Sequence, residues 1–309
     1  TARTGTEIDK NIIRKKVYLR GFSTSNLKEY TRMFFKDEEC RTLVLNQLEA
    51  NPNLCSLCSV PLFCWIIFKC FDHFHSTFDS HELPDITVTL TDIFLLMTEV
   101  HLNRTQKTNL LKKNTRSQEE TYRTNKNILF ALSKIAHRGM QKSLFVFDQD
   151  EILCDLSEQD LHLGFFKVLP DYGSCLDQSS YEFLHLTLQS FFTALFLVMD
   201  EKVGEKELLH FFAECSTLNN TPLSNCFPIS WLKNHEATGE DPFRNNEHFH
   251  FTNLFLCGLL SKAKHKLLKH LVPSASIKKK RKMLLAYFSQ SMKSHLKGLI
   301  RARLKEYKQ

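Results

Sequence analysis

The chain has 309 residues, of which 42% are hydrophobic and 24% charged, and its formal net charge is +7. This length suits two or three domains, and the apolar content is ample for their cores. No signal peptide opens the sequence, and no apolar run reaches the roughly 18 residues of a membrane span, so we expect a soluble, intracellular protein. Only nine glycines accompany 26 phenylalanines, a composition that favours packed helices over a phosphate-binding α/β fold.

The ten cysteines are scattered along the sequence, as expected of reduced thiols in a cytosolic protein. Cys55 and Cys58 form a C-x-x-C pair, which is one half of a common zinc motif. The pair lies in an almost uncharged, helical run, and no second well-formed pair accompanies it. We therefore interpret these cysteines as small buried hydrophobic side chains, not as metal ligands.

The N-terminal part of the chain changes from strand to helix near Ser23. Residues 1–7 and 15–23 are typical of a strand end, a loop and a second strand. Ser23 is a good N-cap, and apolar residues at helical spacing follow it. We expect helix through residue 48, a break at Asn51-Pro52-Asn53, and helix again over 54–71. Pro61 lies within this last run and is typical of the first turn of a helix.

The middle of the chain alternates polar segments with apolar periodic ones. The expected elements are a polar linker over 76–88, an amphipathic helix from Thr89 or Thr91 onward, an exposed loop over 107–127, a helix over 127–140 and a short strand over 143–147. Residues 148–160 are expected to form a variable loop. The segments 164–170 and 181–186 then pair as a β-hairpin. Helices followed by such a hairpin and another helix make a winged-helix pattern.

The segment Tyr181–Val198 joins this hairpin to the most apolar helix of the chain. From Thr187 onward the apolar residues recur at helical spacing, which predicts one buried face. That stripe comprises Leu184, Leu188, Phe191, Leu195 and Val198. His185 lies where the strand meets the helix. A helix N-terminus carries unpaired N–H groups and a partial positive charge, so a histidine there could help to hold an anion such as phosphate, or could touch no ligand at all.

The C-terminal part is helical and strongly basic. We expect helices over 207–215 and 249–271, separated by a polar loop through Gly239. Residues 261–309 hold fifteen Lys and Arg and one acid, so this tail carries +14 and the remaining chain −7. The densest run, IKKKRK at 277–282, is typical of a helix with a solvated basic face, a localisation signal, a nucleic-acid patch or a contact with acidic phospholipids.

The sequence lacks the motifs of a complete ATPase. It has no G-x-x-x-x-G-K-[ST] loop, no Gly-Lys pair and no hydrophobic strand ending in paired acids for Mg²⁺. It shows neither a leucine-rich repeat period nor a death-fold segment, and no nucleophile, base and orienting group stand together. Because it also starts at Thr1 and not at methionine, we expect a fragment that is not an enzyme by itself.

Several segments resemble the NACHT family, the NOD-like receptors of innate immunity. The string FLHLTLQSFFTALFLV (183–198) looks like the family's winged-helix histidine motif, and four other segments agree with it. These are residues 51–68, 89–106, 137–147 and 248–273. The resemblance implies a mainly α chain. Its domains would be the C-terminal end of an α/β P-loop nucleotide-binding domain at 1–23, helical domain 1 at 24–85, a winged-helix domain at 86–204 and helical domain 2 at 205–309.

The same resemblance assigns three residues to a nucleotide, ADP or ATP, with Mg²⁺ in the full-length parent. Thr-x-Arg at the start of the chain is similar to the sensor 1 motif, so Arg3 would face the terminal phosphate of ATP. Pro61 matches the proline of a GxP-like motif that packs against adenine, although Ser59 stands where the family often has glycine. His185 would hydrogen-bond the β-phosphate of ADP.

The function that the resemblance implies is a nucleotide-dependent switch in a cytosolic pattern-recognition receptor. It would control self-oligomerisation and pro-inflammatory NF-κB signalling in response to bacterial peptidoglycan. The implied partners are the upstream nucleotide-binding domain, downstream leucine-rich repeats, further copies of the receptor, and a signalling kinase bound outside this segment. The location would be cytoplasmic, with peripheral contact to the plasma membrane as a further interpretation of the basic tail.

An alternative function from another class is a winged-helix nucleic-acid binder that uses the basic tail. It predicts base-reading residues on the helix before the wing, here taken as residues 127–140. That helix offers only Lys134, His137 and Arg138 as long polar side chains. The fold pattern alone does not decide between the two functions.

Overall fold

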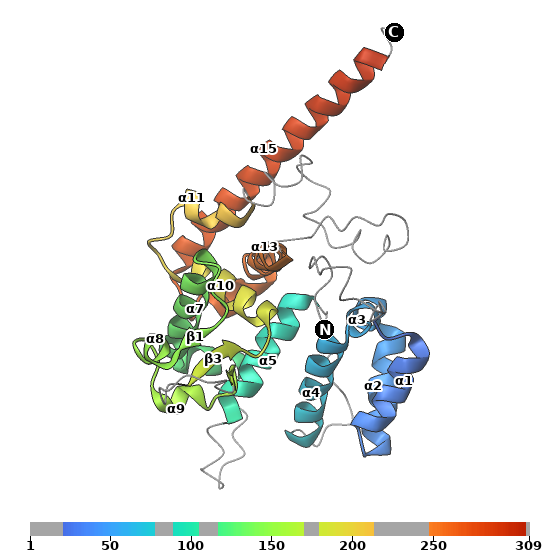
Figure 1. Cartoon of the computed structure of the whole chain (residues 1–309). Coiled ribbons are helices and arrows are strands. Elements are labelled where there is room, and N and C mark those ends of the chain that lie inside the picture. Colours follow the sequence, from blue (N-terminus) through green and yellow to red (C-terminus); the bar gives the residue numbers. More distant parts are fainter. Residues whose placement is uncertain (1–20, 78–88, 105–116, 170–178, 213–246, 307–309) are drawn as a thin grey trace, which may run out of the picture. The chain divides into compact units, whose positions relative to one another are not determined.

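The computed structural model describes residues 21–77, 89–104, 117–169, 179–212 and 247–306 (Figure 1). The described residues are mainly helical with one small sheet, so the predicted fold class is confirmed. The chain divides into two compact units, residues 1–108 and 109–309. The predicted domain boundaries after residues 23, 85 and 204 remain predictions.

The first unit is a set of helices whose ends follow local sequence signals. Its helices are α1 (Thr24–Phe34), α2 (Glu38–Ala50), α3 (Pro52–Cys58), α4 (Pro61–Thr77) and α5 (Leu90–Arg104). Ser23 caps α1 as predicted, and Asn26 completes a capping box with it. Thr89 caps α5, since its hydroxyl accepts from the N–H of Asp92 at 3.2 Å. The predicted helix over 54–71 is divided into α3 and α4, because Ser59 and Val60 form a turn before Pro61.

An aromatic cluster holds the first unit together. Tyr30 and Phe68 stack with ring centroids 5.5 Å apart, and Phe35 lies 5.1 Å from Phe68. Phe63 meets Phe94 edge to face at 6.3 Å, which joins α4 to α5. Each such pair adds roughly 0.5–1.5 kcal/mol beyond the burial of apolar area. The interior of this unit is therefore fixed mainly by α4.

The second unit contains the sheet and the remaining helices. Its elements are α6 (Gln118–Thr124), α7 (Lys126–Gln141), β1 (Phe147–Asp148), α8 (Gln149–Leu153), α9 (Glu158–Leu161), β2 (Phe166–Leu169), β3 (Ser180–Phe183), α10 (Leu186–Met199), α11 (Glu205–Leu208), α13 (Glu247–Leu259), the 3₁₀ turn η2 (Lys262–Lys264), α14 (His265–Leu268) and α15 (Ser274–Glu306). The predicted hairpin is confirmed: β2 and β3 are antiparallel, with Phe166 opposite Phe183. With β1 paired to the other edge of β3, the sheet order is β1-β3-β2. Together with α7, α8 and α9, this is a winged-helix arrangement.

Helix α10 lies at the centre of the second unit, between α7 and α13 (Figure 1). The spacing of Leu188, Phe191 and Leu195 predicted one buried face, but every residue from Thr187 to Met199 is buried. The predicted burial of this stripe is confirmed, and burial extends around the helix because helices pack on both sides of α10. The hydroxyls of Ser190 and Thr193 donate to carbonyls of α10 itself, at 3.2 and 2.8 Å, whereas the Gln189 amide donates to the carbonyl of Leu144 at 3.0 Å.

Three stretches predicted as loop or as continuous helix are organised differently. Helix α6 lies in the predicted loop over 107–127, because the buried side chain of Tyr122 anchors it. Helices α8 and α9 lie in the predicted loop over 148–160, where Ser157 caps α9 through a capping box. The predicted helix over 249–271 ends at Leu259 and restarts at His265. Among the described helices, none is long and apolar enough to cross a bilayer.

Candidate functional site

The structure describes two of the three residues assigned to a nucleotide. Arg3 is outside the described residues. Pro61 lies in the first unit and His185 in the second, and each site is built within its own unit. The structure therefore gives a local geometry for two of the three predicted residues.

Pro61 is the exposed first residue of α4, where a proline lacks only an N–H that the helix would leave unpaired anyway. The turn before it is held from the N-terminal side: the N–H of Phe22 donates to the carbonyl of Ser59 at 2.7 Å. A Cβ on Gly21 would lie 2.4 Å from that carbonyl oxygen, so only glycine allows this approach. Contact between Gly21 and Ser59 thus fixes the position of Pro61. No local sequence pattern indicates this contact, because its two residues are 38 positions apart.

His185 is the N-cap of α10. Its ring Nδ1 accepts from the backbone N–H of Thr187 at 3.2 Å and lies 2.9 Å from the Thr187 hydroxyl. Because Nδ1 acts as an acceptor, the proton of the neutral ring is on Nε2, which makes Nε2 the donor. The residue is exposed, whereas the helix that it begins is buried. The predicted position of His185 at the junction of strand and helix is confirmed.

This geometry suits an anion. The N-terminus of α10 carries the partial positive charge of a 14-residue helix, and its first turn contains no acidic residue. The imidazole of this exposed histidine adds a second group that can donate to an anion. The combination matches the chemistry of phosphate recognition at helix N-termini.

The C-terminus of α10 is capped by Lys280, a residue distant in sequence that the sequence analysis did not single out. The Lys280 ammonium donates to the carbonyl oxygens of Leu197, Val198 and Asp200 at 2.8, 3.0 and 2.5 Å. Its side chain is only 2% exposed. A helix C-terminus leaves its last carbonyls without intrahelical partners, and here one buried cation satisfies three carbonyls.

A signal for this role is present in the sequence. Ile277, Lys280 and Leu284 are three and seven residues apart, so they share one face of α15, and all three are buried. Lys280 therefore belongs to the docked face, although it lies inside the basic run 277–282. Burial lowers the pKa of Lys280 to about 8, and the carboxylates of Asp200, Glu201 and Glu207 act in the opposite direction.

Arg281, the next residue of α15, caps a second helix. Its Nε donates to the carbonyl of Leu260 at 2.6 Å, and its Nη2 donates to the carbonyl of Ser261 at 3.0 Å, just past the end of α13. The remaining lysines of the run, Lys278, Lys279 and Lys282, are exposed. The interpretation of a solvated basic face therefore holds for three of the five cations, and the other two bind α15 to α10 and α13.

His137 of α7 packs against the same end of α10. Its ring stacks on Phe196 with centroids 4.3 Å apart and is 6% exposed. Burial, with a smaller contribution from His210, lowers the pKa of His137 to about 4, while Asp200 acts in the opposite direction. His137 is thus a neutral core residue at physiological pH, which removes one of the three side chains considered for reading bases.

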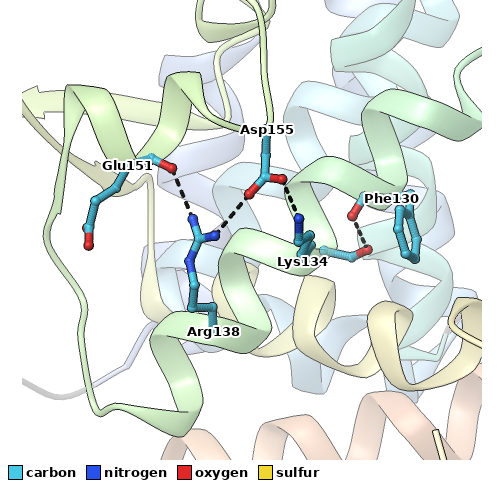
Figure 2. Close-up of polar contacts among 6 residues, drawn as sticks. Phe130, Lys134, Arg138, Glu151 and Asp155 are labelled. Atoms are coloured by element: carbon cyan, nitrogen blue, oxygen red, sulfur yellow. Dashed lines mark hydrogen bonds and ion pairs between the residues drawn. The ribbon is translucent and has the colours of Figure 1, made fainter. Parts of the chain in front are cut away.

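The other two candidate readers bind one buried carboxylate (Figure 2). Lys134 Nζ lies 2.7 Å from Asp155 Oδ1, and Arg138 Nη1 lies 3.0 Å from Asp155 Oδ2. Arg138 Nη2 also donates to the carbonyl of Glu151 at 3.0 Å. The Asp155 side chain is 11% exposed, so the two cations neutralise a largely buried charge. They connect α7 to the segment that contains α8 and do not form a basic surface.

The helix directly before the wing is α9 and not the helix over 127–140, which corrects that prediction. The segment from β1 through α9 contains six acidic residues and no Lys or Arg. The acids are Asp148, Asp150, Glu151, Asp155, Glu158 and Asp160. A surface of this sign repels the phosphates that supply most nucleic-acid affinity. The winged-helix arrangement here is therefore poorly suited to nucleic acid.

The cysteines of the C-x-x-C run lie at the corner between α3 and α4. Cys58 and Cys64 are buried, and the Cys64 thiol together with burial raises the pKa of Cys58. Such a thiol is a poor metal ligand and a poor nucleophile. Within the described residues, no three His, Cys, Asp or Glu side chains gather as a metal site.

Comparison with known proteins places this geometry in a family. Residues 185–306 match the family described as NLRC4 helical domain HD2. The whole chain is 53% identical, over 315 residues, to nucleotide-binding oligomerization domain-containing protein 1 of Homo sapiens. It is 26% identical to human nucleotide-binding oligomerization domain-containing protein 2 over 82% of the chain, and 26% identical to the bovine NACHT, LRR and PYD domains-containing protein 3 over 66%.

The alignments cover 33%, 24% and 18% of these three relatives, so the chain corresponds to a third or less of each. The relatives are NOD-like receptors and not classical enzymes. The match to the HD2 family begins at His185 and includes α10, α13 and α15, the three helices that Lys280 and Arg281 hold together. The chain therefore belongs to the NACHT family, the NOD-like receptors of innate immunity.

Proposed function

We propose that this chain is the regulatory segment of a nucleotide-dependent switch in a cytosolic pattern-recognition receptor. The observation that carries the proposal is His185, an exposed histidine that caps the N-terminus of a buried helix. In the resting receptor His185 would donate to the β-phosphate of ADP, and Pro61 would pack against adenine. Two of the relatives are named for a nucleotide-binding oligomerization domain, which supports this choice of ligand.

The switch works through differential affinity. A contact between His185 and the β-phosphate exists only when the winged-helix segment lies against the nucleotide-binding domain, so ADP would favour the closed state. ATP, with Mg²⁺ bound upstream, would favour the open state, and Arg3 would detect the terminal phosphate. A charged hydrogen bond of roughly 1.5–3 kcal/mol shifts such an equilibrium by about ten- to a hundredfold.

The open state would expose surfaces for self-oligomerisation. Peptidoglycan fragments would be sensed by leucine-rich repeats outside this segment, and a signalling kinase would bind an effector domain outside it, leading to NF-κB activation. Within this scheme the described residues carry no chemistry of their own. His185 would contact the phosphate, and α10 would connect this contact to the helices packed around it.

The test is a reporter assay on the full-length receptor that contains this chain. His185→Ala removes both the cap and the phosphate donor, whereas His185→Asn retains an N-cap acceptor on a shorter side chain. We expect both variants to raise ligand-independent NF-κB signalling by about tenfold or more, since both lose the phosphate contact. A rise in the alanine variant alone would assign His185 a capping role. An unchanged signal in both, at equal expression, would contradict the switch.

A further inference from the structure

Helix α15 presents an exposed apolar row in addition to its docked face. Leu285, Met292 and Leu296 are 60%, 50% and 58% exposed. They are seven and four residues apart, so they lie on one side of the helix, and we name them the α15 row. The rotation of α15 is fixed, because Ile277 is buried and the buried Lys280 binds three carbonyls of α10. The α15 row therefore stays in solvent within one chain, and such rows mark contact surfaces.

Exposed lysines border the α15 row. Lys282 and Lys293 each precede a residue of the row by three positions, and Lys297 follows Leu296 directly. Helix α15 has no acidic residue before Glu306, so it supplies no counter-charge beside these lysines. A partner that fits this side of α15 must offer apolar contact and negative charge together.

The same unit exposes a short strip of the opposite charge. The side chains of Leu144, Val146 and Asp148 are exposed at alternate positions of the chain. Between the last two, Phe147 is buried. The exposed Glu151 follows Asp148 by three positions, at the start of α8. We name Leu144, Val146, Asp148 and Glu151 the acidic strip. No Lys or Arg occurs from β1 through α9, so this strip keeps its negative charge.

The α15 row and the acidic strip are complementary. Each combines apolar side chains with charges of one sign, and the two signs are opposite. Figure 1 shows them at different ends of the second unit: β1 and α8 lie at one end, and the C-terminal part of α15 extends from the other. Since both are exposed, they do not cover each other within one chain. Two copies of the chain can bring one of each surface together.

Other occupants satisfy only part of the surface on α15. Two α15 rows that faced each other would place lysines against lysines, and like charges opposed in an interface are costly. Nucleic acid would meet the lysines but would leave the apolar row in water. The acidic strip supplies apolar contacts and carboxylates at once. A contact between two unlike surfaces is heterologous, so it repeats from copy to copy and builds a ring or a filament.

We propose that a second copy of this chain docks head to tail on α15. Its acidic strip lies on the α15 row, and the carboxylates of Asp148 and Glu151 meet the lysines that border the row. This proposal deepens the self-oligomerisation in the proposed function and rests on that function for its role in the receptor. The contact does not involve the phosphate contact of His185, so an experiment without nucleotide tests it separately.

The test is sedimentation velocity of the purified 309-residue chain, without nucleotide, over a range of protein concentrations. The wild type should form species larger than a monomer that grow with concentration and that weaken with added salt. The variant Asp148→Lys and Glu151→Lys should associate about tenfold or more weakly, because lysines then face lysines. The variant Lys293→Glu and Lys297→Glu should lose a similar factor, because carboxylates then face carboxylates.

The decisive variant carries all four substitutions in one chain. It exchanges the charges between the two surfaces and keeps the net charge of the wild type. Head-to-tail association should therefore recover most of the lost strength, which also shows that each substituted surface is folded. A four-substitution variant that stays monomeric would overturn the proposal, and so would a wild type that is monomeric at every concentration.

The matched controls lie in the first unit, where Glu29→Lys and Lys36→Glu each reverse one exposed charge. Both should associate like the wild type. His185→Asn should do so as well, because it leaves the α15 row and the acidic strip intact. An equal loss in the controls would overturn the proposal. Wild-type association of the Asp148 and Glu151 variant would assign the contact to two α15 helices and would also overturn it.

Discussion

At its N-terminus α10 is capped by His185, the residue that begins it, whereas at its C-terminus it is capped by Lys280, which lies 83 residues after Leu197 in the sequence. The first cap is exposed and local, and the second is buried and brings α15 onto α10. A local exposed cap can bind a ligand through its other ring nitrogen without disturbing the core. A buried cap from another helix cannot be released without undocking that helix. In the proposed switch, the exposed end of α10 would therefore sense the ligand, whereas the buried end attaches α15.

We expect the largest loss of stability when the buried cap at the C-terminus of α10 is removed. Lys280→Met keeps the volume of the side chain but removes the ammonium donor from the buried carbonyls of Leu197 and Val198. The Asp200 carbonyl keeps the N–H of Val203, so the second unit should lose about 3 kcal/mol of stability in total. Differential scanning calorimetry should show a melting temperature lower by roughly 6–12 °C for a unit of this size. Lys279→Met, at an exposed neighbour, should melt like the wild type. Equal melting of all three proteins would show that the cap contributes nothing.

The buried end should also respond to acid through His137. The pKa of His137 is about 4 in the folded chain against an ordinary 6.5, so between these values the unfolded state binds more protons. Stability is then fully present above pH 6.5 and is lost as the pH falls toward 4, by up to about 3 kcal/mol.

Urea unfolding at several pH values measures how steeply the free energy of unfolding changes with pH. The variant His137→Phe retains a flat ring against Phe196 but has no titrating group, so its stability should fall less steeply with acid. Parallel slopes for variant and wild type would exclude His137 as the origin of the pH dependence.

Arg281 should give a smaller effect than Lys280, since it donates to two carbonyls and is half-buried. Arg281→Gln should cost about 1–2 kcal/mol and should loosen α13 more than α10. Hydrogen exchange resolved along the chain can distinguish these helices. Faster exchange at the end of α10 with α13 unchanged would be opposite to the expected pattern.

The smallest effect on stability is expected at the exposed end. His185→Ala removes one N-cap hydrogen bond and should cost about 1 kcal/mol or less. His185→Asn should restore most of it, because asparagine is itself a good N-cap. Urea midpoints of the isolated chain provide the comparison. A loss as large as that of Lys280→Met would mean that His185 supports the fold, and the contrast between the two ends would disappear.

The local features of the fold were predictable from the sequence because they depend on neighbouring residues. The Ser23 cap, the hairpin that pairs Phe166 with Phe183, and the position of His185 follow from short-range patterns. The burial of α10 on all sides was not predictable, because it depends on α7 and α13 packing against it. The helices α8 and α9 were predicted as a loop for the same reason: α8, for example, contacts Arg138 of α7 through the carbonyl of Glu151.

The residues of the candidate site also fall into those that local sequence patterns predict and those that they do not. Pro61 and His185 are found where the sequence placed them, but Gly21 and Lys280 act through partners distant in sequence. Lys280 lies among four other cations, and composition favoured a solvated face for all of them. Only its spacing from Ile277 and Leu284 indicated the buried side of the helix.

The central claim is that the exposed end of α10 recognises the phosphate of bound ADP, and nucleotide affinity tests it most directly. In the full-length receptor, isothermal titration calorimetry with ADP compares the wild type with His185→Asn, which retains the cap. Loss of a charged hydrogen bond should weaken ADP binding by about ten- to a hundredfold, while Lys279→Met leaves it unchanged. An ADP dissociation constant that is the same in the wild type and in His185→Asn would contradict the account.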